Sequence, residues 1–186
     1  EVLDGKIYFA GGHDNSAKSI AERYDPATNQ WETLNPMSVV RTGVAAAVLN
    51  GKLYAIGGQD LTSVEIFDPT TGQWSVGPAL PSEVNRGSAI AVNGKILLVG
   101  GRNANDVSLN QVLELDPATN QWSQKAAMPT ARAGTKLVLF EGKVWAISGN
   151  WVEIYDPAAN TWSTGPSLTI NRGWPSTWTA NGRIYA

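Results

Sequence analysis

Short apolar segments alternate with turn residues along the whole chain, and none of them shows the 3.6-residue period of an amphipathic helix. In the clearest unit, an apolar run at 43–49 is followed by an Asn-Gly pair and by a second apolar run at 52–56. Asn-Gly favours a two-residue type I′ turn, so the two runs predict a β-hairpin. Both runs are apolar on both faces, which is typical of strands covered by neighbouring sheets. Further strands at 64–67 and 73–74 complete a predicted four-stranded antiparallel sheet.

This unit occurs four times with constant internal spacing. In each, an Asp-Pro turn begins six residues before a tryptophan, and that tryptophan lies 20 residues before the glycine of the next hairpin turn. The four tryptophans are Trp31, Trp74, Trp122 and Trp162. Only one loop varies in length. It runs from the glycine that ends the Gly-Gly or Ser-Gly pair after the hairpin to the aspartate of the Asp-Pro turn, an interval of 13, 10, 15 and 7 residues in the four units. A repeat whose length varies in one loop alone is typical of a scaffold that presents those loops for recognition.

A single sheet of this kind cannot bury both faces, so successive units must pack against one another. Radial packing gives a β-propeller, with the tryptophans between adjacent sheets. A solenoid or a β-sandwich is the alternative. We therefore predict one all-β domain over 1–186, with repeats at about 1–36, 37–81, 82–129 and 130–168 and a partial repeat at 169–186.

The order of motifs in each unit resembles the kelch repeat. A turn glycine, a basic residue, an apolar-Tyr pair and Gly-Gly precede Glu-x-aromatic-Asp-Pro-x4-Trp, as in the stretch from Gly51 to Trp74. The match covers the entire chain, although Ser148 replaces one glycine and Leu113 replaces the glutamate of the third unit. The resemblance implies a propeller of four-stranded antiparallel kelch blades. Kelch propellers close with six or seven blades, so we expect an incomplete ring of about four blades plus a partial one, with more blades beyond both ends.

Composition and charge narrow the choice of partners. A formal net charge of −2 gives no electrostatic reason to expect nucleic acid or an acidic lipid surface, and no apolar run reaches the length of a membrane span. The absence of cysteine excludes a disulfide framework and leaves the compartment open. We expect neither nucleic acid nor a membrane as partner, and no cofactor.

One arginine departs from the repeat. Arg41, Arg132 and Arg172 each follow their tryptophan by ten residues, and we expect them to bond backbone carbonyls between blades. In the third unit Val84 occupies that position, and the arginine lies two residues later, at Arg86, although the spacing from tryptophan to glycine stays at 20 residues.

The hairpin register places Arg86 opposite Gly101, next to Arg102, so two guanidiniums are expected at the sheet edge that carries the variable loops. In the kelch adaptors of ubiquitin ligases, an Asn-Arg pair and an arginine after Gly-Gly bind acidic peptides, and Asn85, Arg86 and Arg102 match those positions. The resemblance thus implies an acidic ligand, while solvated loop arginines without a ligand are the alternative.

The candidate ligand-binding face consists of loop positions at this edge, namely Asn85, Arg86, Arg102, Asn103, His13, Asn15, Thr42, Gln59, Asn150 and Trp174. His13 is the only histidine, and one histidine without cysteine cannot assemble a copper or zinc site, so no metal is predicted. Trp174 could stack on a sugar or fill the core, and Trp178 is expected to fill the core.

We predict a non-enzymatic binding module that engages a protein or peptide through its variable-loop face. The alternative is a fragment of a carbohydrate-active kelch enzyme, similar to galactose oxidase or a sialic acid mutarotase, with catalytic residues outside this chain. The stretch from Arg172 to Ser176 resembles one in galactose oxidases, but the copper chemistry of that family needs cysteine and histidine ligands that this chain lacks. A scaffold without a dedicated ligand is the third option.

Overall fold

The computed structural model describes residues 1–171 and 176–186, and all regular elements in these ranges are β-strands. They form four antiparallel four-stranded sheets in chain order and one two-stranded sheet. The first sheet contains β1 (Val2–Leu3), β2 (Lys6–Ala10), β3 (Ala21–Asp25) and β4 (Gln30–Leu34), and the second contains β5 (Ala45–Leu49), β6 (Lys52–Ile56), β7 (Val64–Asp68) and β8 (Gln73–Val76). The third contains β9 (Ser88–Val92), β10 (Lys95–Val99), β11 (Val112–Asp116) and β12 (Gln121–Gln124), and the fourth contains β13 (Lys136–Phe140), β14 (Lys143–Ser148), β15 (Trp151–Asp156) and β16 (Thr161–Thr164). The last sheet pairs β17 (Trp178–Ala180) with β18 (Arg183–Tyr185).

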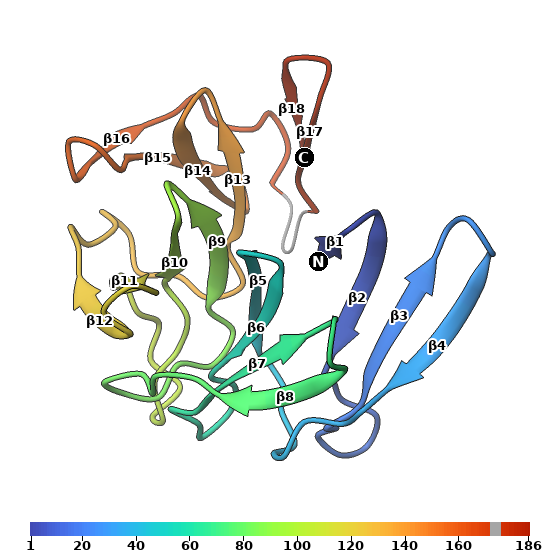
Figure 1. Ribbon diagram of the computed structural model, residues 1–186. Coiled ribbons are helices and arrows are strands. Elements are labelled where there is room, and N and C mark those ends of the chain that lie inside the picture. The colour runs from blue at the N-terminus through green and yellow to red at the C-terminus, as the bar shows by residue number, and fades with distance from the viewer. Residues whose placement is uncertain (172–175) are drawn as a thin grey trace.

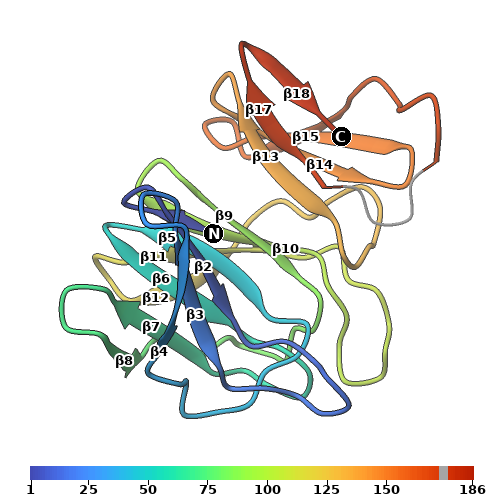
Figure 2. The ribbon, with the colours of Figure 1, turned by 90° about the vertical axis from the view of Figure 1, so that its right-hand side faces the viewer.

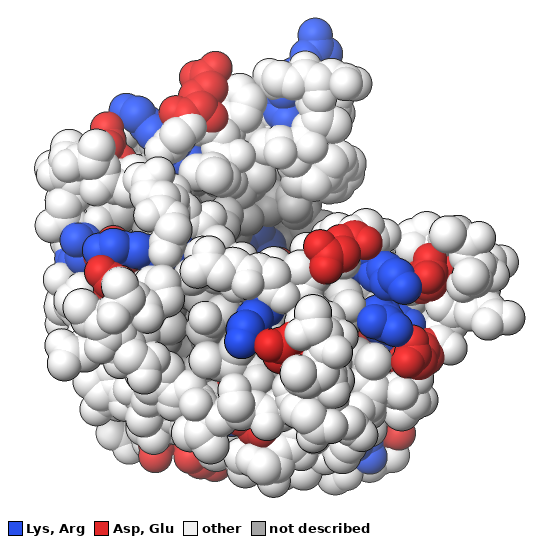
Figure 3. Space-filling view, in the orientation of Figure 1, with Lys and Arg blue, Asp and Glu red and all other residues white. Residues whose placement is uncertain are grey.

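The sheets are arranged like blades around an axis, and Figure 1 shows the first strand of each four-stranded sheet near the centre and its fourth strand at the rim. β9 lies next to β5 on one side and β13 on the other, so the inner strands of successive blades are neighbours. The ring is open between the last sheet and the first, as the two ribbon views (Figure 1 and Figure 2) and the space-filling view (Figure 3) show. The prediction of an all-β, incomplete propeller is confirmed. In the described residues, no helix has the length and apolar character that a membrane crossing needs.

The turns follow from the residues at the predicted positions. In the β5–β6 hairpin, Asn50 and Gly51 have φ values of 50° and 71°, as a type I′ turn requires. In the Asp-Pro turn, the Asp68 carboxylate accepts a hydrogen bond from the Thr70 backbone N–H at 2.9 Å, and Gly72 adopts a φ of 68°. The turns therefore recur at the same positions in each blade, and the variable loop lies between the second and third strands.

The cores lie between adjacent blades, and the repeat tryptophans mark these interfaces. The indole N–H of Trp74, Trp122 and Trp162 donates to a carbonyl four residues after the tryptophan of the preceding blade, at 2.8 Å in each case. The predicted inter-blade position is confirmed for these three. It is wrong for Trp31, which is 56% exposed because the described chain supplies no blade on that side. Trp178 is also not a core residue, since it is 54% exposed and stacks on Tyr185.

The Gly-Gly pairs allow close approach of the linker, which is the segment that connects the fourth strand of one blade to the first strand of the next. A Cβ on Gly57 would lie 2.6 Å from the Val84 carbonyl oxygen, and the Gly58 N–H donates to that same oxygen at 3.0 Å. The close approach leaves no space for a side chain at Gly57. The pairs thereby fix the linker that begins each new blade against the loop edge of the previous one.

Behind the loop edge, the second and fourth blades contain a buried ion pair that the third lacks. Arg41 is fully buried and donates to the carbonyls of Gly57 and Ser63 at 2.7 and 2.8 Å and to Glu65 at 3.1 Å. The expected bonds from Arg41 to backbone carbonyls are confirmed, but both carbonyls lie in its own repeat and not in a neighbouring blade, and Glu65 is a further partner.

In the fourth blade the equivalent pair is Arg132 and Glu153, and here the described partner is the carboxylate and not a carbonyl. In the third blade the equivalent residues are Val84 and Leu113, which are buried in one apolar cluster. Both members of the ion pair have thus been replaced together. Arg172, the last arginine of the set, lies outside the described residues.

Candidate ligand-binding site on the loop edge

The third blade's hairpin continues beyond its regular strands and brings the two predicted arginine segments together. Val99 pairs with Ser88 at the end of β9 and β10, and beyond this point Asn85 and Arg102 exchange backbone hydrogen bonds of 2.9 and 2.7 Å. Arg86 and Arg102 therefore lie on adjacent segments at the loop edge, in the register that the sequence predicts.

The backbone of Arg86 has a conformation that favours glycine. Its φ is 54°, and the equivalent positions in the neighbouring blades are Gly43 and Gly134, with φ values of 64° and 66°. The Arg86 N–H donates to the Gly43 carbonyl and the Gly134 N–H donates to the Arg86 carbonyl, both at 2.8 Å. The left-handed conformation costs an L-residue about 1–2 kcal/mol, and glycine avoids this cost. The third blade therefore places a guanidinium where the scaffold itself is satisfied by glycine.

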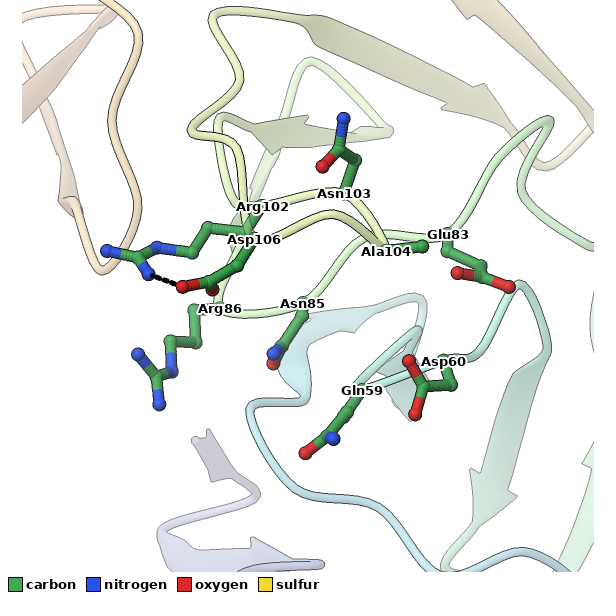
Figure 4. Close-up of a pocket in the computed structure, with 9 residues that line it drawn as sticks. All are labelled: Gln59, Asp60, Glu83, Asn85, Arg86, Arg102, Asn103, Ala104 and Asp106. Atoms are coloured by element: carbon green, nitrogen blue, oxygen red, sulfur yellow. Dashed lines mark hydrogen bonds and ion pairs between the residues drawn. The ribbon is translucent and has the colours of Figure 1, made fainter.

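Arg86 and Arg102 line a hollow of about 250 Å³ between the loops of the second and third blades. Figure 4 shows the nine residues that line it, which are Gln59, Asp60, Glu83, Asn85, Arg86, Arg102, Asn103, Ala104 and Asp106. Five of the predicted site residues are thus brought together. Sequence reasoning missed the three carboxylates, although each lies within four residues of a predicted site residue, and that proximity was the available signal.

The charges in this hollow are separated. Arg102 and Asp106 form an ion pair of 2.5 Å, and this hydrogen bond, with a smaller contribution from the Arg86 charge, holds the pKa of Asp106 below its usual value. It is the only ion pair among the nine residues of Figure 4. In that view both guanidiniums lie on one side of the hollow and the Asp60 and Glu83 carboxylates on the other, with the amides of Asn85 and Gln59 between them.

Two buried polar atoms in this hollow have no partner in the described chain, the Asn85 Oδ1 and the Arg102 Nε. The Asn85 amide packs directly over Gly43, where a Cβ would lie 2.0 Å from its Oδ1. A side chain at position 43 would therefore displace Asn85. The arrangement offers a ligand an exposed guanidinium, neutral amides and two carboxylates.

A second hollow of about 330 Å³ adjoins the first, because Gln59 and Asp60 line both. Thr42, a predicted site residue, lines it too, and the Gln59 N–H donates to the Thr42 carbonyl at 2.9 Å. Its remaining lining is mostly aliphatic, from Ala17, Val39, Val40 and Leu61.

The other predicted site residues line neither hollow. His13 and Asn15 are exposed in the loop of the first blade, and Asn150 lies in the short β14–β15 turn, where its carbonyl accepts the Leu168 N–H at 3.0 Å. Trp174 lies outside the described residues. Within the described ranges, no group of three or more histidines, cysteines or carboxylates is placed to hold a metal ion.

A family model described as the KLHDC2/KLHL20/DRC7 Kelch-repeats domain matches residues 1–183. The chain belongs to the kelch-repeat family. Among its relatives, the F-box/kelch-repeat protein At1g67480 of Arabidopsis thaliana is 41% identical over 59 residues, which are 31% of this chain and 16% of that protein. The Kelch-like protein 31 of Homo sapiens is 42% identical over 67 residues, covering 32% and 11% of the two chains. The Kelch-like ECH-associated protein 1A of Danio rerio is 39% identical over 62 residues, covering 31% and 10%.

A solved structure has a similar fold. The structure of YjhT superposes with a TM-score of 0.79 over 90% of this kelch chain and 64% of YjhT, at 20% sequence identity. This likeness shows the fold alone. The matched regions span between 10% and 16% of the three curated relatives, so the activities of those whole proteins are not carried over to this chain.

Proposed function

We propose that this kelch domain is a non-enzymatic binding module whose loop edge holds a segment of a partner protein through an acidic side chain. The observation that carries the proposal is Arg86. Its guanidinium makes no ion pair with the other residues of the hollow, and its backbone conformation is one that glycine would adopt at lower cost. A residue held in a sparsely populated conformation at an exposed edge is typical of a functional site.

The surrounding groups support the proposal. A carboxylate in the hollow can accept a charge-assisted hydrogen bond from Arg86, and the amides of Asn85 and Asn103 can bond the backbone of an extended segment. Family membership supports it as well. Two of the relatives reported above are kelch-like proteins, and the resemblance to kelch adaptors implies binding of a protein segment at this edge. The alternative of a carbohydrate-active enzyme stays an untested prediction, since its catalytic residues were expected outside this chain.

The experiment is selection of peptides from a displayed random library on the 186-residue chain, followed by calorimetric titration of the selected peptides. Arg86→Gly is the test variant, because glycine occupies the equivalent position in both neighbouring blades. Arg183→Gln, an exposed arginine in β18, is the control. We expect acidic peptides whose affinity falls about tenfold with Arg86→Gly, the ratio of a 1.4 kcal/mol loss, and is unchanged with Arg183→Gln. Selected peptides that bind Arg86→Gly as tightly as the parent contradict the proposal.

A further inference from the structure

The charges of the hollow are not those of a site for a purely acidic ligand. Its lining contains two arginines and three carboxylates, so its formal charge is −1. Arg102 is already paired with Asp106, which leaves Arg86, Asp60 and Glu83 without an ion-pair partner among the lining residues. A ligand with acidic groups alone would bring one of them to Arg86 and any others toward Asp60 and Glu83. Like charges at close range are unfavourable, and more so where water is excluded.

The two kinds of charge lie on opposite sides. Figure 4 shows the Arg86 guanidinium on the side of the Arg102–Asp106 pair and the Asp60 and Glu83 carboxylates across the hollow. A ligand that satisfies both sides must itself carry an anionic and a cationic group. Asp60 lies on the variable loop of the second blade, whereas Glu83 and Arg86 lie three residues apart on the linker into the third blade, so a ligand must place its two charges to suit both segments.

The adjoining hollow adds an apolar element. Val39, Val40 and Leu61 line it, and Val40 is 53% exposed. Gln59 and Asp60 line both hollows, so the aliphatic residues meet the charged hollow at these two residues. The aliphatic residues therefore adjoin Asp60, while Arg86 lines only the charged hollow.

We propose that this edge selects an extended peptide segment in which an aliphatic, a basic and an acidic side chain occur in this order at alternate positions, because alternate side chains of an extended chain point to the same side. The aliphatic side chain covers Val40 and Leu61, the basic one binds Asp60 and Glu83, and the acidic one binds Arg86. This inference rests on the proposed function and adds the cationic and aliphatic requirements to it.

The test uses four capped heptapeptide sequences, each in two orders, and the 186-residue chain, with binding followed by fluorescence anisotropy of a dye on the peptide. The parent peptide has the sequence Ala-Leu-Ala-Lys-Ala-Glu-Ala, which places the three test side chains on one side of an extended chain. Three variants replace Lys by Gln, Glu by Gln, or Leu by Ser, and each peptide is also made in reversed order, so that either direction of binding is sampled. We expect the parent sequence, in one of its two orders, to bind about tenfold more tightly than the Lys→Gln and Glu→Gln peptides and severalfold more tightly than the Leu→Ser peptide, since a charge-assisted hydrogen bond corresponds to about a tenfold change in affinity.

Protein variants identify which side binds which charge. Asp60→Asn/Glu83→Gln should remove the preference for Lys over Gln and keep the preference for Glu, and Arg86→Gly should do the reverse. Glu141→Gln, an exposed carboxylate in the β13–β14 hairpin turn, is the control and should change neither. Thermal unfolding of each variant checks that the blades remain intact.

The outcomes separate this inference from the proposed function. If the Lys→Gln peptide binds as tightly as the parent peptide, and Asp60→Asn/Glu83→Gln tightens both, the edge is an acidic-ligand site and the inference is wrong while the proposed function stands. If no peptide binds at millimolar concentration, the inference is wrong, and the library selection with Arg86→Gly decides the proposed function separately.

Discussion

The second and third blades share their strand lengths and turns but differ in how they use arginine. In the second blade, Arg41 and Glu65 form a buried pair that joins the linker to the sheet. In the third, Val84 and Leu113 replace this pair within an apolar cluster, and an arginine appears two residues later on the exposed loop edge. A buried ion pair can be exchanged for apolar residues without loss when both members change together. The difference shows that the scaffold does not require an arginine at position 86, since glycine occupies the equivalent position in both neighbouring blades, and this supports the proposal that Arg86 serves a ligand.

Breaking the second blade's pair should have the largest effect. Glu65→Leu leaves Arg41 buried without its carboxylate, and we expect a loss of about 3–5 kcal/mol in the free energy of unfolding, measured by urea denaturation. Arg41→Met/Glu65→Leu imitates the third blade and should recover more than half of that loss. A loss below about 1 kcal/mol for the single variant would show that the pair is not structural.

The apolar interface of the third blade should be the next most sensitive. Trp122 packs against the cluster that contains Val84 and Leu113, and Trp122→Ala should cost about 3 kcal/mol or more, the usual range for a large side chain removed from a core. Trp31 has the same motif in the sequence but is 56% exposed, so Trp31→Ala should cost less than about 1 kcal/mol. Equal losses in urea would show that exposure does not separate these two tryptophans.

The buried pair of the second blade should also make the free energy of unfolding depend on pH, with a smaller effect than the substitutions above. Burial alone would raise the pKa of Glu65, but the hydrogen bonds from the Ser38 backbone and from Arg41 outweigh it, so the pKa lies below its ordinary value. A lowered pKa in the folded state stabilises the fold above the ordinary value of about 4.3 and loses that contribution as the pH falls through the lowered pKa. Wild-type stability should therefore decline more steeply below about pH 4.3 than that of Arg41→Met/Glu65→Leu. Parallel pH profiles would contradict this assignment.

Much of this architecture could be predicted from the sequence, because local chemistry decides it. Asn-Gly and Asp-Pro turns fixed the hairpins, and the constant spacing placed Trp74, Trp122 and Trp162 between blades. Trp31 and Trp178 were placed wrongly in the core, because their burial depends on neighbouring sheets and not on their own segments. The hairpin register predicted that Arg86 lies near Arg102, but it could not predict which residues of other loops lie beside them.

Asp60 and Glu83 show the limit most clearly. They reach the hollow from the second blade's variable loop and from the linker, and a repeat pattern does not describe how such segments approach one another. Similarly, Val84 and Leu113 were each recognised as departures from the repeat, but only the fold shows that these residues, 29 positions apart, belong to one buried cluster.

The central claim is that Arg86 is held for binding at some cost to the fold, and one variant tests it most directly. Arg86→Gly relieves the left-handed backbone at a φ of 54° and keeps the hydrogen bonds to Gly43 and Gly134. We expect the variant to be more stable by about 1 kcal/mol in urea denaturation, the cost that an L-residue pays in this conformation, while its affinity for the selected peptides falls about tenfold. A variant that is less stable than the parent and binds those peptides equally well would contradict the account, because Arg86 would then support the fold and not the ligand.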